Sequence, residues 1–146
     1  MQKESLKRNF KFEANKYPLD PGLKLIEASA GTGKTFAISH LILRLITEKN
    51  ISIKKILVVT FTEAAAAELK ARISHRIELA LIGLEAIERK EPINPPDEVL
   101  EKWLLEKCEN ESKRFNYANS LLQALEEIDT AEITTIHGFC KRSLQK

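Results

Sequence analysis

Apolar residues along the chain gather in short runs, and their spacing alternates between that of strands and that of helices. After an irregular start over residues 1–21, the first apolar run, Leu23–Glu27, predicts a strand. From Lys34 to about Thr47 apolar residues recur at helical spacing, which predicts a helix whose apolar stripe packs on a sheet. The stripe comprises Ile38, Leu41, Ile42, Leu45 and Ile46. Asn50 is a suitable residue to end this helix.

The run Ile56–Phe61 is nearly continuous and rich in β-branched residues, which is typical of a parallel strand covered on both faces. Strand, helix and strand in this order predict a right-handed βαβ crossover. Thr62 is followed by Glu63 and a run of alanines, which predicts a helix that has Thr62 as its N-cap and continues to about Arg89.

Prolines within Lys90–Pro96 end this helix, and helical patterns return over Asp97–Cys108 and Glu111–Ile128. We interpret Trp103 as a packing residue of the first of these helices. The run Ile133–Ile136 predicts a third short strand.

The segment between the first predicted strand and helix carries the clearest chemistry. Ala28–Thr35 ends in Gly-Lys-Thr, and its place between strand and helix is that of a phosphate-binding loop. Backbone N–H groups there point at a polyphosphate, Lys34 reaches the β- and γ-phosphates, and the Thr35 hydroxyl ligates Mg²⁺. Gly31 and Gly33 allow the backbone to approach the phosphates closely. An ordinary strand–turn–helix with a surface lysine is the less favoured interpretation, because the motif has its required context.

Three loops follow the predicted strands at their carboxyl ends, namely Ala28–Thr35, Thr60–Thr62 and Thr135–Cys140. In open α/β sheets the chemistry gathers at these ends. The pattern therefore favours a motor core that binds a nucleotide and a polymer.

Composition changes this picture only slightly. The 146 residues carry 23 Lys and Arg against 21 Asp and Glu, and the net charge of +2 is too small to indicate nucleic-acid binding by itself. With 43% hydrophobic and 30% charged residues, the chain is expected to form one domain or part of one. Cys108 and Cys140 lack metal-ligand spacing, so we interpret them as reduced thiols, with Cys140 in buried packing. The sequence has no signal-like or membrane-length apolar run, which predicts a cytoplasmic protein without membrane contact.

Three segments, in this order, resemble the motifs of superfamily 1 DNA helicases. Glu27–Thr35 is similar to motif I, Thr60–Ile73 to motif Ia, and Thr135–Cys140 to motif Ib. Ala28 stands where the strict loop pattern has Gly, and this departure is typical of the group. Within the superfamily the three segments most resemble the RecB-type beta subunits of exodeoxyribonuclease V. The resemblance extends over residues 23–146.

The resemblance implies an α/β fold class: a partial P-loop NTPase (RecA-like) parallel sheet with flanking helices plus a helical insertion. It assigns 1–73 and 131–146 to part of the first, ATP-binding motor domain, and 74–130 to the insertion, a partial 1B-like subdomain. It implies ATP and Mg²⁺ as cofactors, with Lys34 and Thr35 as catalytic residues and Thr35 as the metal ligand. The expected ATP-binding residues are Ala28, Ser29, Ala30, Gly31, Thr32, Gly33, Lys34 and Thr35.

The resemblance also implies DNA as a partner, as single strands and duplex ends, together with RecC- and RecD-type subunits. Motifs Ia and Ib contact single-stranded DNA in this family, which points to Phe61, Thr62, Thr135 and His137. From the residues alone, Phe61 either stacks on a base or packs in the core, and Thr62 is first a helix cap. His137 lacks the partners of a zinc site.

We therefore expect the N-terminal ATP-binding portion of a RecB-type ATP-dependent DNA helicase/exonuclease subunit that acts in double-strand-break repair and recombination. A UvrD/Rep- or AddA-type helicase and a truncated, non-catalytic nucleotide- or DNA-binding module are the alternatives, and a small P-loop kinase is disfavoured. The acidic residues Glu126, Glu127 and Asp129 follow a helical pattern, which is not that of an acidic metal-binding strand end. We thus expect these 146 residues to be one piece of a larger enzyme and to be inactive alone.

Overall fold

The fold is described from a computed structural model, which covers residues 12–26 and 33–145. Over these ranges the chain is mostly helical, with a small parallel sheet. The helices are α1 (Lys34–Glu48), α2 (Glu63–Glu88), α3 (Glu98–Lys107), α4 (Glu111–Glu127) and α5 (Ile136–Leu144). The strands are β1 (Leu57–Thr60) and β2 (Glu132–Thr135), and short 3-10 turns span Ile53–Lys55 and Ile128–Thr130.

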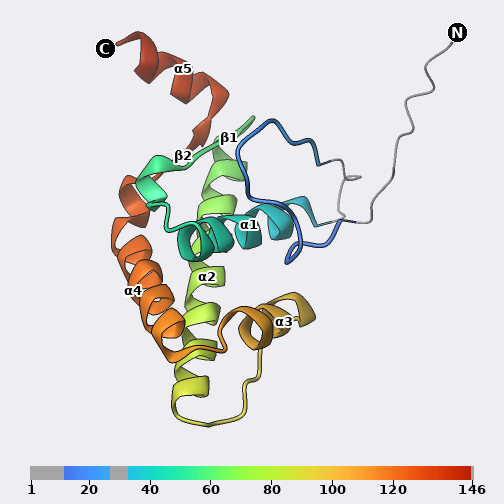
Figure 1. The fold of residues 1–146 in the computed structure, drawn as a ribbon. Coiled ribbons are helices and arrows are strands. Elements are labelled where there is room, and N and C mark those ends of the chain that lie inside the picture. The colour runs from blue at the N-terminus through green and yellow to red at the C-terminus, as the bar shows by residue number, and fades with distance from the viewer. Residues whose placement is uncertain (1–11, 27–32, 146) are drawn as a thin grey trace, which may run out of the picture.

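The sheet forms between two strands that are far apart in sequence. β1 and β2 run parallel, with Leu57 opposite Glu132 and Thr60 opposite Thr135. Parallel pairing needs a long crossover, and here α2, α3 and α4 supply it (Figure 1). The prediction of an α/β class with a parallel sheet is confirmed, although the sheet has only two strands within the described ranges.

The first predicted strand is not formed. Residues Leu23–Ile26 make no strand pairing, and Leu23 and Leu25 are exposed, while Glu27 lies outside the described residues. The physical reason is that a strand needs a neighbour, and β1 and β2 pair only with each other in the described ranges. The βαβ crossover expected around the first helix is therefore not observed.

The face of β1 that points away from the core is apolar but open. Leu57 is 47% and Val59 is 39% exposed, whereas Val58 and Ile133 pack against the core. The prediction that β1 is covered on both faces is thus wrong for the described residues. Its continuous apolar pattern was correctly assigned to a strand.

The core lies mainly between helices, and the inner face of the small sheet packs against α2. α1 packs against α2 and α4, so the prediction that its stripe packs on a sheet is wrong, and Ile38 of that stripe is 38% exposed (Figure 1). The fully buried side chains of this core include Leu43, Ile46, Ile73, Ile77, Leu100, Trp103, Leu104 and Leu121. Trp103 stacks on Tyr117 at 5.8 Å between ring centroids, which confirms it as a packing residue.

Polar caps set the helix ends close to where the sequence predicted them. The Thr62 hydroxyl accepts a hydrogen bond from the Ala65 N–H (3.1 Å), and the Asp97 and Asn110 side chains cap α3 and α4 in the same way. Asn50 follows α1 with φ of 51°, the left-handed conformation that Asn tolerates after a helix.

The two cysteines have opposite environments. Cys108 is buried, and burial raises the pKa of its thiol to about 12, so it stays protonated and inert. Cys140 is exposed on α5, which corrects the expectation that it packs in the interior. The physical reason is that α5 buries none of its side chains and projects away from the helical body (Figure 1).

Candidate functional site

The N-terminus of α1 has the features of an anion-binding helix end. Gly33 precedes the helix with φ of 89°, a left-handed conformation that strains any residue with a Cβ. No side chain of the described residues caps α1, and its first turn contains no acidic residue. The first N–H groups of the helix therefore lack a side-chain acceptor, and they add to the positive end of the helix dipole.

Lys34 and Thr35 are the first two residues of α1. Lys34 opens α1 with an exposed side chain, and the half-buried Thr35 follows it in the same first turn. An ammonium group, a hydroxyl and uncapped N–H groups are the donor set that a Mg²⁺-bound polyphosphate needs, so the residues present fit this ligand. The other predicted loop residues, Ala28, Ser29, Ala30, Gly31 and Thr32, lie outside the described residues.

A second group of predicted site residues meets at the carboxyl edge of the sheet. Because Thr60 pairs with Thr135, the residues that follow each strand lie next to one another. Phe61 follows β1 and is 90% exposed, which excludes the core packing that the sequence left open. Thr62 caps α2 as expected, and its residue is exposed. His137 is also exposed, in the first turn of α5.

Thr135 has a structural role at this edge. Its hydroxyl accepts from the Gly138 N–H (3.0 Å), capping α5, and donates to Glu63 Oε1 (3.3 Å) in the first turn of α2. Thr135 is buried, so direct contact with DNA is not open to its side chain. Its effect on a ligand would be indirect, through the N-terminus of α5 that it caps. Glu63 was not singled out from the sequence as a site residue, although an acidic residue after a Thr cap is a recognisable signal.

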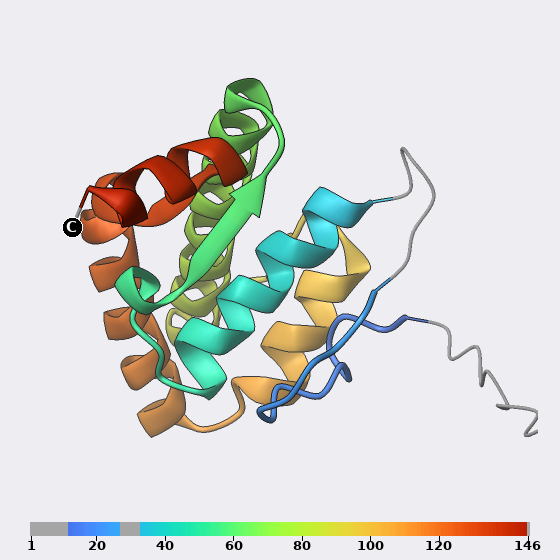
Figure 2. The same ribbon diagram turned by 90° about the horizontal axis from the view of Figure 1, so that it is seen from above.

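The two groups face the same side of the molecule. Figure 2 shows α1 running antiparallel to β1, so the first turn of α1 lies at the end where β1 finishes. α2 and α5 both begin at that end, each directly after a strand. Three helix N-termini and two strand ends are thus directed toward one region, whereas the first predicted strand, whose end was expected to join them, is not formed over residues 23–26.

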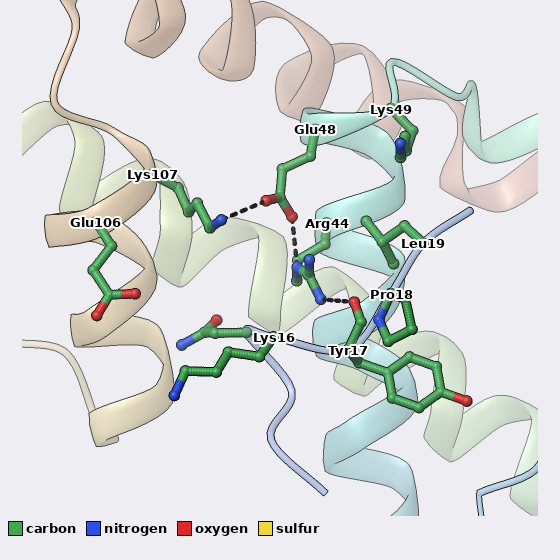
Figure 3. Close-up of a pocket in the computed structure, with 10 residues that line it drawn as sticks. Lys16, Tyr17, Pro18, Leu19, Arg44, Glu48, Lys49, Glu106 and Lys107 are labelled. Carbon is green, nitrogen blue, oxygen red and sulfur yellow. Dashed lines mark hydrogen bonds and ion pairs between the residues drawn. The ribbon is translucent and has the colours of Figure 1, made fainter.

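A hollow in the described part of the chain lies away from both groups of residues. A cavity of about 420 Å³ opens beside the far end of α1, lined by residues 15–19, by the end of α3 and by Arg44, Glu48 and Lys49 (Figure 3). Arg44 donates to Glu48 (2.5 Å) and to the Tyr17 carbonyl (2.8 Å), and Lys107 pairs with Glu48 at 3.7 Å. Because these charges already have partners, we interpret the cavity as the seam where residues 12–19 are fixed to α1.

The described ranges hold no cluster of three or more His, Cys, Asp and Glu that suits a metal ion. No helix in these ranges is both long and apolar enough to span a membrane.

Residues 13–146 match the family described as UvrD/REP helicase N-terminal domain. The chain is 43% identical over 132 residues to the RecBCD enzyme subunit RecB of Escherichia coli, a match that covers 84% of this chain and 10% of that protein. It is 40% identical over 146 residues to the Haemophilus influenzae subunit RecB, covering 91% and 12%, and 40% identical over 131 residues to that of Chlamydia muridarum, covering 86% and 12%.

The chain belongs to the UvrD/REP helicase N-terminal domain family. Its RecB homologues confirm the resemblance inferred from the three motifs. Family membership implies a RecA-like fold and ATP binding. The chain spans about a tenth of the length of the curated relatives it matches.

Proposed function

We propose that this chain is the N-terminal, ATP-binding portion of a RecB-type ATP-dependent DNA helicase/exonuclease subunit that acts in double-strand-break repair and recombination. The observations that carry the proposal are the 43% identity to a RecB subunit over 84% of this chain and the family match over residues 13–146, which include all three motifs. The whole enzyme would act in the cytoplasm on single strands and duplex ends of DNA, with RecC- and RecD-type subunits as partners.

In this proposal α1 and the loop before it bind the nucleotide. The N–H groups that open α1 would hold the phosphates, Lys34 would neutralise their charge, and the Thr35 hydroxyl would hold the Mg²⁺ that accompanies the nucleotide. Bound Mg²⁺ would neutralise negative charge that develops on the phosphates. The uncapped, exposed start of α1 supports this role.

DNA would bind along the carboxyl edge of the sheet. The exposed ring of Phe61 offers a surface on which a base of any identity can stack. Thr62 and His137 offer polar groups to phosphates, and Thr135 orients the start of α5. The division into motor-domain residues, 1–73 and 131–146, and an insertion, 74–130, remains a proposal, and α2 continues without a break across position 73.

Replacing Lys34 tests the nucleotide site. Lys34→Ala is expected to weaken ATP binding about ten- to a hundred-fold, because it removes a charge-assisted contact worth roughly 1.5–3 kcal/mol. Equilibrium titration of the chain with Mg²⁺–ATP measures the effect. Lys49→Ala, at the opposite end of the same helix, serves as the charge-matched control and should bind as wild type does. Equal affinities of Lys34→Ala and wild type would refute the assignment.

Replacing Phe61 tests the DNA surface. Phe61→Ala is expected to lose about 1–3 kcal/mol of affinity for single-stranded DNA if a base stacks there. Its melting temperature should stay unchanged, since the ring is 90% exposed. Phe115→Ala, which removes an exposed ring from α4, is the control for both measurements. DNA affinity that survives in Phe61→Ala would remove Phe61 from the proposed interface.

A further inference from the structure

A polar cluster with the buried His40 and Arg76 at its centre joins four parts of the chain. It consists of Asn15 before α1, His40 on α1, Arg76 on α2 and Asp97, the cap of α3. Arg76 Nη1 donates to Asp97 Oδ2 (2.5 Å), and Arg76 Nη2 and Nε lie 2.8 and 3.1 Å from His40 Nδ1. His40 Nε2 lies 2.6 Å from Asn15 Oδ1, and the Asn15 amide donates to the Val99 carbonyl at 2.8 Å.

The protonation state that these contacts require is well defined. His40 is buried, and this burial together with the cations Arg76 and Arg44 lowers its pKa to about 3, against the opposing effect of Asp97. The ring is therefore neutral near pH 7, so Nδ1 accepts from Arg76 while the Nε2–H donates to Asn15. Arg76 in turn holds the pKa of the Asp97 carboxyl below its usual range, although burial acts in the opposite direction.

Arg76 also contacts the first turn of α1. Its guanidinium carbon lies 4.7 Å from the centre of the Phe36 ring, and Phe36 directly follows Lys34 and Thr35. The His40 ring lies parallel to Phe36, 5° off and 6.5 Å away. The Arg76 guanidinium, whose orientation is fixed by Asp97 and His40, thus packs from α2 against the first turn of α1, which contains the proposed phosphate-binding residues.

We propose that Arg76 is a positioning residue for nucleotide binding, which fixes the first turn of α1 through Phe36 so that Lys34 and Thr35 face the phosphates. This inference rests on the proposed function of that turn. Burying a charged group is costly unless it is paired, and Arg76 lies on the same face of α2 as the buried Ile73 and Ile77. Its bonds to Asp97 and His40 supply the pairing and also fix the guanidinium over the Phe36 ring. The contact also connects α2, which begins at the sheet edge, to the nucleotide turn.

The test compares two substitutions in the full 146-residue chain. Phe36→Leu removes the ring beneath the guanidinium but keeps an apolar side chain and the whole polar cluster. Arg76→Met removes the guanidinium and keeps an apolar stem. Both are expected to weaken Mg²⁺–ATP binding about five- to tenfold at a temperature where unfolding curves show each variant to be folded. Arg72→Met, on the same helix and paired with Glu68 on the surface, is the control and should bind as wild type does.

A double-mutant cycle separates positioning from simple stability. Each substitution is combined with Lys34→Ala, and both ATP affinity and melting temperature are measured. If Arg76 acts through the phosphate-binding turn, each double variant loses less binding free energy than the sum of the losses in its two single variants. The changes in melting temperature of the single variants, in contrast, should add. If Arg76→Met does not fold, Phe36→Leu decides alone.

The outcomes distinguish this inference from the proposed function. Wild-type affinity in the folded Phe36→Leu variant, or affinity losses that add with that of Lys34→Ala, would overturn the positioning role while leaving the nucleotide site intact. If wild type itself shows no affinity that depends on Lys34, the proposed function and this inference both fall.

Discussion

Lowering the pH from 7 to 5 is expected to reduce the free energy of unfolding by about 2 kcal/mol through His40 alone. The folded-state pKa of His40 is lowered to about 3, because the ring is buried and lies beside Arg76 and Arg44, with only Asp97 opposing them. In the unfolded chain the pKa returns to about 6.5. Between these values the unfolded state binds the extra proton, so stability is complete above about pH 6.5 and falls as the pH decreases toward 3.

Chemical denaturation at a series of pH values measures this slope. His40→Gln should lower stability overall but flatten its dependence on pH between 7 and 5. His75→Gln, which removes an exposed histidine from α2, is the comparison variant for the loss of a histidine outside the core. If His40→Gln and wild type lose stability in parallel over this range, the buried neutral ring is not the source of the acid sensitivity.

Trp103→Ala is expected to cost about 3–5 kcal/mol of unfolding free energy, a large part of the stability of a domain this size. Trp103 is fully buried at the junction of α3 with the rest of the core, where it stacks on Tyr117. Truncation leaves a cavity that the rigid surrounding helices fill only in part. Thermal or urea unfolding followed by circular dichroism measures the loss.

Trp103→Phe provides the informative comparison. The indole N–H of Trp103 has no hydrogen-bond partner among the described residues, and burying an unpaired donor costs about 1–3 kcal/mol. Phenylalanine removes this donor and keeps most of the apolar surface, so its cost should be well below that of alanine. A Trp103→Phe variant as unstable as Trp103→Ala would mean that the indole N–H contributes to stability.

Local signals in the sequence predicted the helices well. Thr62 before Glu63, Asp97 before Glu98 and the prolines after Lys90 each act within one or two turns, so a single stretch of sequence contains both the cause and the effect. The start of α1 is also marked locally, because Gly33 stands directly before the helix in a left-handed conformation.

Features that depend on distant partners were predicted less well. The apolar run Leu23–Ile26 has the composition of a strand, but a strand also requires a neighbour, and sequence periodicity does not reveal which neighbours are present. Cysteine is a residue type that is usually buried, but Cys140 is exposed because α5 contacts little besides the two strands. The apolar stripe of α1 was recognised correctly, but its packing partners are helices.

The candidate site shows the same division. Phe61 and His137 were proposed as site residues because their segments resemble motifs Ia and Ib, and the register of Thr60 with Thr135 brings these segments together. The cluster of Asn15, His40, Arg76 and Asp97 was not predicted. The residues that bond to one another in it are 21 to 36 positions apart along the chain, which is beyond the reach of local sequence patterns. A signal was present in Arg76, a charged residue at a position where the helical pattern of α2 requires an apolar one.

The open face of β1 has a consequence for handling the isolated chain. Leu57 and Val59 expose apolar surface on a strand whose second edge has no pairing partner in the described ranges, and Leu23 and Leu25 are exposed as well. Unpaired strand edges and exposed apolar patches are templates for self-association. Molecules of this chain at high concentration will therefore tend to adhere edge to edge. Binding and unfolding measurements should be made in dilute solution and shown not to change with protein concentration.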